Sequence, residues 1–74
     1  MKKILITGAA GFLGQLAIDY FKNRYKLFLI DKINLKNKNF TKIDITNYLE
    51  VDKVIKKIKP DIILHYASEI FDTY

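Results

Sequence analysis

One stretch near the start of the chain combines three local signals: Ile4-Leu5-Ile6-Thr7-Gly8-Ala9-Ala10-Gly11-Phe12-Leu13-Gly14. Its first three residues are apolar without alternation, which is typical of a strand buried on both faces, as in a parallel sheet. Three glycines then interrupt the apolar run, and a helical repeat of apolar residues follows. We therefore predict a strand over 2–7, a glycine-rich turn and a helix in immediate succession.

The helix over 12–23 is predicted from the spacing of its apolar residues. They recur at the i, i+3, i+4, i+7 and i+8 positions of a single helical face. These residues are Leu13, Leu16, Ala17, Tyr20 and Phe21. Because an amphipathic helix buries its apolar face, we expect this set to pack on the sheet, which gives Tyr20 a structural role.

The rest of the chain alternates between strand and helix signals. In chain order we predict a buried strand at 27–30, a polar loop at 32–39, a less buried strand at 40–45, a helix and a last strand at 61–67. The helix begins after Thr46 or Asn47, which can cap it, and ends before Pro60. Such alternation implies βαβ units with right-handed crossovers. The expected fold class is α/β, with a mostly parallel sheet of about four strands and a helix on each face.

The three glycines have distinct physical uses between a strand and a helix. Gly8 allows a tight turn, Gly11 lets a pyrophosphate approach the backbone, and Gly14 lets the helix pack closely on the sheet. The free N–H groups at the helix start can then bind the phosphates. A glycine triplet also occurs in ordinary loops, but here the flanking strand and helix favour a dinucleotide-binding turn.

Asp31 ends the second predicted strand, 23 residues beyond Gly8. An acidic residue about 20 residues after the first glycine can accept hydrogen bonds from the adenosine ribose hydroxyls and repel a 2′-phosphate. Lys32 follows directly and weakens that discrimination, so NAD is favoured and NADP stays possible. An ordinary polar residue at a strand end is the alternative interpretation of Asp31.

The run Ile6-Thr7-Gly8-Ala9-Ala10-Gly11-Phe12-Leu13-Gly14 resembles the TGxxGxxG motif of the extended short-chain dehydrogenase/reductase family. Its members are NAD-dependent sugar epimerases, dehydratases and 4-keto-sugar reductases. Asp44-Ile45-Thr46 resembles the Asp-Ile segment after the third strand of the family, and residues 59–68 resemble its P-D-x-V-x-H-x-A-A strand. The nearest branch is the dTDP-4-dehydrorhamnose reductase-like and epimerase branch. The resemblance covers nearly the whole chain and implies a partial Rossmann fold.

The resemblance also implies roles for further residues. Phe12 and Leu13 would lie beside the pyrophosphate, and Asp44, with Ile45 next to it, would contact the adenine. Ala67 and Ser68 would lie near the ribose on the nicotinamide side, although the family often has alanine at the position of Ser68. For His65 we expect a packed or hydrogen-bonded strand residue without a chemical role.

The catalytic pair of this family is not found in the sequence. Its members use a tyrosine as acid/base and a lysine four residues later that lowers the tyrosine pKa. None of the 5 tyrosines is followed by lysine at that spacing; Tyr20, for example, is followed by Arg24. We therefore expect a cofactor half-site with no catalytic residue.

The predicted strand order, 3-2-1-4, leaves one edge of the last strand open. We expect exposed apolar surface near Ile62, Leu64, Ile70 and Phe71, covered by a second copy in a homo-oligomer or by a missing C-terminal half. Residues 1–74 would then be the N-terminal part of an NAD(P)-binding domain. Two other functions stay open: a self-standing nucleotide-binding or regulatory module, and a basic interaction protein that has lost the ligand.

The composition fits one small globular domain. Half of the 74 residues are hydrophobic, which excludes a disordered tail. With no cysteine and one histidine, neither a disulfide nor a Cys/His metal site can stabilise the core. The net charge is +5, but the lysines are scattered or lie in the polar loop, so we expect no nucleic-acid partner. No apolar run approaches the roughly 18 residues of a membrane span, so we expect no membrane association and a cytoplasmic location.

Overall fold

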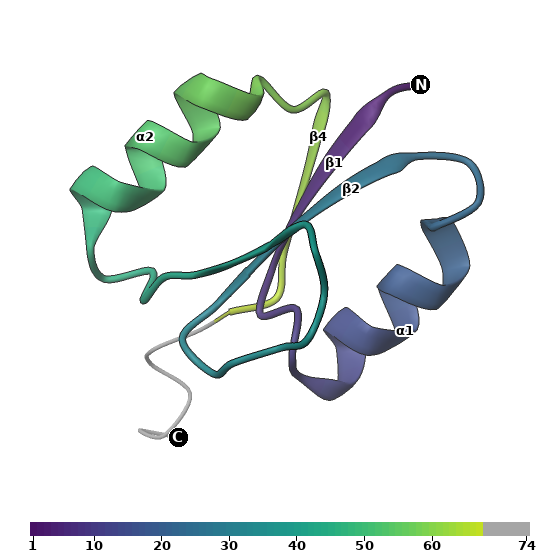
Figure 1. Ribbon diagram of the computed structural model, residues 1–74, viewed down its shortest axis with the longest axis horizontal. Coiled ribbons are helices and arrows are strands. Elements are labelled where there is room, and N and C mark those ends of the chain that lie inside the picture. Colours follow the sequence, from purple (N-terminus) through teal and green to yellow (C-terminus); the bar gives the residue numbers. More distant parts are fainter. Residues whose placement is uncertain (68–74) are drawn as a thin grey trace.

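The computed structural model describes residues 1–67. Four strands form one sheet with a helix on each face (Figure 1). The elements are β1 (Lys3–Thr7), α1 (Phe12–Phe21), β2 (Lys26–Asp31), β3 (Phe40–Lys42), α2 (Tyr48–Ile58) and β4 (Ile62–His65). This confirms the predicted α/β class and the order of the elements along the chain.

The strands lie in the order β3-β2-β1-β4, and every pair is parallel. In the register, Leu5 of β1 stands opposite Phe28 of β2 and Ile63 of β4. The predicted strand order is therefore correct. Because all strands point the same way, their carboxyl ends meet at a single edge of the sheet.

The core has two halves, one on each face of the sheet. On the α1 face, Ile4 and Ile6 pack with Leu29 and Ala17. On the α2 face, Leu5 packs with other buried residues and with the apolar side of α2. Since the central strand β1 is buried on both faces, its unbroken apolar run is explained.

The buried face of α1 differs from the predicted one. Gly14 and Ala17 are buried, whereas Leu13, Leu16 and Tyr20 are 56%, 51% and 68% exposed. The cause is Gly14, because only a residue without a side chain allows the helix backbone to approach the turn so closely. The close approach turns Leu13, Leu16 and Tyr20 away from the sheet, so the prediction that they pack on it is wrong. Phe21 does pack against the core, and the ring of Tyr20 contacts it edge-on.

Several boundaries also differ. The helix expected over 12–23 ends at Phe21, β4 is shorter than 61–67, and β3 stops at Lys42 rather than at 45. The Asp44 carboxylate explains the end of β3, since it accepts hydrogen bonds from both the Thr46 N–H and the Thr46 hydroxyl and turns the backbone toward α2.

Both ends of α2 are capped. Asn47, one of the two expected caps, accepts the Glu50 N–H through its side chain, and its side-chain amide donates to the Glu50 carboxylate at 2.7 Å. At the other end Lys59 takes a left-handed conformation with φ 53°, and its N–H donates to the Ile55 carbonyl at 2.8 Å. The Asp52 carboxylate, 2.9 Å from the Lys56 ammonium, raises the pKa of Lys56.

The outer strand β4 carries exposed apolar residues within the described part of the chain. Ile62 and Ile63 are 38% and 46% exposed, as expected for an open edge, whereas Leu64 is partly buried against the core. Ile70 and Phe71 lie outside the described residues. Neither α1 nor α2 has the length and apolar character needed to cross a lipid bilayer.

Candidate functional site

A cleft of about 180 Å³ lies at the carboxyl ends of the strands. In open α/β sheets ligands bind in this position, beyond the strand ends and beside the start of a helix. The residues that line it are Gly8, Gly11, Asp31, Lys32, Ile33, Ile43, Ile45, Tyr66 and Ala67. The glycine-rich turn after β1 thus meets the ends of β2 and β4 and the segment after β3.

Two of the three glycines are required by the fold. Gly8 has φ 68°, a conformation that L side chains rarely adopt, and a Cβ there would stand 2.8 Å from the Ala67 nitrogen. A Cβ on Gly14 would stand 2.7 Å from the Ala9 Cα. Both positions are therefore closed to larger residues by the backbone of the protein itself.

Gly11 is not required by the fold in this way. Its φ of −80° suits any residue, and the nearest atom to an added Cβ would be the Gly8 carbonyl oxygen at 3.4 Å, an ordinary contact distance. Gly11 also lines the cleft. Because Gly11 has no side chain, its backbone is accessible from the cleft.

Within residues 1–67, the start of α1 presents backbone donors that no side chain satisfies. Gly11 is the N-cap and has no side chain to accept hydrogen bonds from the N–H groups of the first turn, and that turn carries no acidic residue. The helix dipole adds partial positive charge at this end. Phe12 and Leu13, at the same end, are exposed and do not line the cleft. The arrangement suits a phosphate group.

Asp31 connects the end of β2 to the glycine-rich turn. One carboxylate oxygen accepts the Ala10 N–H at 2.9 Å and the other accepts the Ile33 N–H at 3.0 Å. Each oxygen of an ionised carboxylate can accept a further hydrogen bond. Asp31 can therefore hold the turn and still bind hydroxyl groups of a ligand in the cleft.

Side chains also join the ends of β1 and β4. The buried Thr7 hydroxyl lies 2.7 Å from Nδ1 of His65 and accepts the Ala67 N–H at 3.2 Å. The expectation that His65 is hydrogen-bonded is confirmed. These contacts hold Ala67 over Gly8, at the edge of the cleft.

Asp44 does not line the cleft, whereas Ile45 does. The two hydrogen bonds from Thr46 hold the pKa of the Asp44 carboxyl below its ordinary value, and the charge of Lys32 acts in the same direction. One carboxylate oxygen of Asp44 thus holds the turn before α2.

The structure brings six of the predicted site residues together. They are Gly8, Gly11, Asp31, Lys32, Ile45 and Ala67. Four others do not line the cleft, namely Phe12, Leu13, Gly14 and Asp44, and Ser68 lies outside the described residues. The sequence interpretation missed Ile33, Ile43 and Tyr66. Ile43 could have been found from its place two residues before Ile45, and Tyr66 from its place at the carboxyl end of β4.

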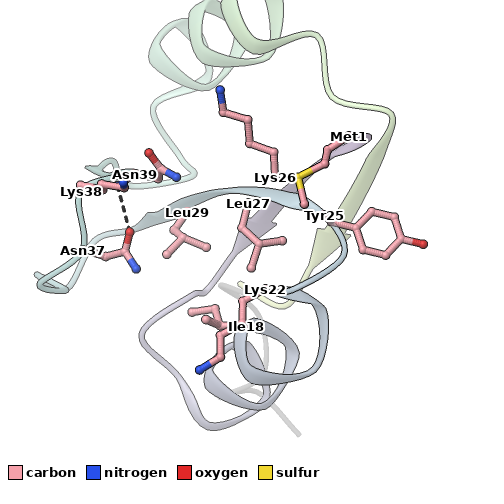
Figure 2. Close-up of a pocket in the computed structure, with 10 residues that line it drawn as sticks. All are labelled: Met1, Ile18, Lys22, Tyr25, Lys26, Leu27, Leu29, Asn37, Lys38 and Asn39. Carbon is pink, nitrogen blue, oxygen red and sulfur yellow. Dashed lines mark hydrogen bonds between the residues drawn. The ribbon is translucent and has the colours of Figure 1, made fainter.

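A larger hollow of about 690 Å³ lies elsewhere, over the α1 face of β2 (Figure 2). Leu27 and Leu29 point into it toward α1. The hollow is left open because the loop between β2 and β3 holds no helix that would cover this part of the sheet. Lys22 on its rim pairs with Asp19 at 3.6 Å, and the Lys26 ammonium lies 5.6 Å from the Phe28 ring centroid. The hollow contains neither the glycine turn nor a carboxylate, so the smaller cleft is the better candidate.

The chain is similar to known proteins over most of its length. The family model described as "NAD dependent epimerase/dehydratase family" matches residues 4–73. The dTDP-glucose 4,6-dehydratase of Neisseria meningitidis is 31% identical over 93% of this chain, and the GDP-6-deoxy-D-talose 4-dehydrogenase of Aggregatibacter actinomycetemcomitans is 35% identical over 93%. The chain covers 24% and 22% of these relatives, so it spans about a quarter of their length.

A solved structure is also similar to this chain over nearly its whole length. The Bordetella bronchiseptica enzyme WbmH, in complex with NAD⁺, superposes with a TM-score of 0.79 at 27% identity. The match covers 97% of this chain and 27% of that one. The similarity thus extends over nearly all of the present chain.

Proposed function

Because this chain belongs to the NAD-dependent epimerase/dehydratase family, we propose that its cleft binds the adenosine and pyrophosphate portion of NAD. The observation that carries the proposal is Gly11, which the fold does not require and which stands beside the unsatisfied donors of α1. A pyrophosphate is the ligand that uses both features, since it needs close access to the backbone and several N–H donors.

The remaining cleft residues suit the nucleoside. Asp31 accepts the ribose hydroxyls with the lone pairs that Ala10 and Ile33 leave unused. Ile33, Ile43 and Ile45 give the cleft apolar walls of the kind that an adenine ring packs against. By the family resemblance, Ala67 and Ser68 lie toward the nicotinamide, and Phe12 and Leu13 lie near the pyrophosphate.

NAD is favoured over NADP by the charge at Asp31. A 2′-phosphate would lie close to a carboxylate that is already held by two backbone N–H groups and cannot easily move away. Lys32 lines the same cleft and offsets part of that repulsion. NADP is therefore the weaker ligand rather than an excluded one.

For the protein as a whole we propose a nucleotide-sugar epimerase, dehydratase or reductase of the cytoplasm. The named relatives act on nucleotide sugars, and the chain spans about a quarter of their length. The 74 residues contain no Tyr-x-x-x-Lys pair, so in this proposal they supply the cofactor half-site and the catalytic pair lies outside them. On its own the chain would bind NAD without turning over a sugar substrate.

A titration followed by amide NMR tests the cofactor proposal. NAD should shift the amide signals of residues 8–14 and of Asp31, and NADP should produce the same shifts at higher concentration. The isolated nicotinamide riboside, which lacks both the adenosine and the phosphates, should leave these signals nearly unchanged. Shifts that miss the glycine-rich turn, or no shifts at millimolar NAD, would contradict the proposal.

A second candidate function is a self-standing, oligomeric nucleotide-binding or regulatory module. The exposed apolar residues of α1 and β4 favour it, because such surface on a small domain is usually covered by protein. Either a second copy of the chain or a C-terminal continuation could cover this surface. Sedimentation of the 74-residue chain distinguishes the two candidates, since only the module is expected to form a defined oligomer by itself.

A further inference from the structure

The hydroxyl of Thr7 has two partners at the end of the sheet. Thr7 is 4% exposed, and its Oγ1 lies 3.2 Å from the Ala67 nitrogen and 2.7 Å from Nδ1 of His65. A backbone N–H can only donate, so Oγ1 accepts from Ala67. Which partner donates in the hydrogen bond between Thr7 and His65 then follows from the protons and lone pairs available.

A hydroxyl has one proton to donate and two lone pairs. If Nδ1 of His65 carried a proton and donated it, the Thr7 proton would need a third partner, and the residues within 1–67 offer none at hydrogen-bond distance. If instead Thr7 donates to an unprotonated Nδ1, every group is satisfied. A buried hydroxyl proton without an acceptor is costly, so the second arrangement is favoured.

We propose that His65 is a positioning residue of the cofactor cleft: its Nδ1 accepts the Thr7 proton and thereby aims a Thr7 lone pair at the Ala67 N–H. This inference rests on the proposed NAD function for its effect on binding, although the geometry that it describes does not. The neutral His65 ring then carries its proton on Nε2.

Ala67 depends on this hydroxyl because it lies beyond the backbone ladder. β4 ends at His65, and the last backbone hydrogen bond between the two strands runs from the Tyr66 N–H to the Thr7 carbonyl at 3.2 Å. The next N–H, that of Ala67, has the Thr7 side chain as its acceptor. Ala67 and Tyr66 both line the cleft, directly above Gly8. A turn of the Thr7 hydroxyl would therefore change the wall that faces the ligand.

The histidine is exposed, so packing does not explain its contact with Thr7. This makes a clean pair of variants possible. In His65→Asn, the side-chain oxygen can occupy the place of Nδ1 and accept the hydroxyl proton. In His65→Leu, a methyl group takes that place, and the branching of the side chain is kept while the acceptor is lost.

Three measurements test the proposal. Nitrogen-15 NMR of the imidazole in the unmodified chain should show Nδ1 unprotonated and Nε2 protonated. His65→Leu should shift the Ala67 amide signal and weaken NAD binding roughly two- to tenfold, the range of one neutral hydrogen bond. It should also lower the melting temperature modestly, because the buried Thr7 proton loses its acceptor. His65→Asn should restore both the amide signal and the affinity.

A double variant tests whether the two side chains act as a unit. Thr7→Val should weaken NAD binding like His65→Leu, and adding His65→Leu to it should cause no further loss, because the shared interaction is already gone. A protonated Nδ1, an Ala67 signal unmoved in His65→Leu, or an Asn variant as impaired as the Leu variant would overturn the proposal.

Failure of the NAD function would look different. If the unmodified chain does not bind NAD, the proposed function is contradicted. The imidazole spectrum and the Ala67 amide signal would still show whether His65 positions the end of β4.

Discussion

Gly14 and Ala9 lie in backbone contact, so close that a Cβ on Gly14 would stand 2.7 Å from the Ala9 Cα. This contact fixes how α1 sits on the sheet, and it brings the start of the helix to the edge of the cleft. Gly11 lies between the two residues in sequence but makes no such contact. The fold therefore requires Gly14 but not Gly11, and the role that we propose for Gly11 is to leave room for the ligand.

We expect matched alanine substitutions to separate these roles. Gly14→Ala should destabilise the chain by about 1–3 kcal/mol or more, because the backbone cannot give way to the added methyl group. Gly11→Ala should change the free energy of unfolding by no more than about 1 kcal/mol, because its backbone conformation suits alanine while alanine is the poorer N-cap. Yet it should weaken NAD binding roughly tenfold or more. Urea unfolding and a binding titration on both variants provide the check. Equal NAD affinity in Gly11→Ala and the unmodified chain would remove the main support for the site.

The charge of Asp31 should set the choice between the two dinucleotides. In Asp31→Asn the one side-chain oxygen can accept only one of the two backbone N–H groups, and the charge that we propose to bind ribose hydroxyls and to repel a 2′-phosphate is gone. We expect NAD affinity to fall about tenfold, as for loss of one charge-assisted hydrogen bond, and NADP affinity to fall less. Asp19→Asn is the matched control, since it makes the same charge change on α1 outside the cleft. If both variants change the NAD-to-NADP ratio equally, the effect belongs to net charge and not to Asp31.

Much of the fold could be predicted because its signals are local or repeat along the chain. The unbroken apolar run of β1 indicated burial on both faces, and the alternation of strand and helix gave the parallel order. The buried face of α1 could not be read in the same way. The spacing of large apolar residues predicts that Leu13, Leu16 and Tyr20 are buried. The rotation of the helix is instead set by the contact of Gly14 with Ala9, which involves no side chain.

In the site too, residues placed by a local motif could be predicted, whereas residues brought together by the fold could not. Gly8, Gly11 and Asp31 could be predicted, because a motif within the chain places them. Ile33, Ile43 and Tyr66 line the cleft because strand ends from three parts of the chain meet there, and that meeting depends on sheet register. The adenine contact of Asp44 stays a prediction from the resemblance; the structure shows that one of its carboxylate oxygens holds a turn through Thr46, which no motif in the sequence indicates.

The turn at Asp44 should respond to acid. The pKa of Asp44 is lower in the folded chain than in the unfolded one, so its contribution to stability is fully present above the unfolded pKa and is lost as the pH falls through the folded pKa. The Thr46 amide signal should follow this titration, with a midpoint below the ordinary value for aspartate. Thr46→Val should raise the midpoint, because it removes the hydroxyl donor and keeps the backbone N–H. A midpoint at the ordinary value in the unmodified chain would show that the turn does not favour the ionised carboxylate.

The exposed side of α1 should control self-association. Leu16 and Tyr20 are large, apolar and exposed on one helical flank, whereas Ala17 beside them is buried in the core. Leu16→Lys should therefore leave the free energy of unfolding within about 0.5 kcal/mol of the original and shift any oligomer toward monomer. Ala17→Lys, the neighbouring control, should unfold the chain, because it places a charge against the sheet. Sedimentation velocity measures the first effect and circular dichroism the second. Should Leu16→Lys sediment as the unmodified chain does, over a range of concentrations, this flank of α1 takes no part in contacts between copies.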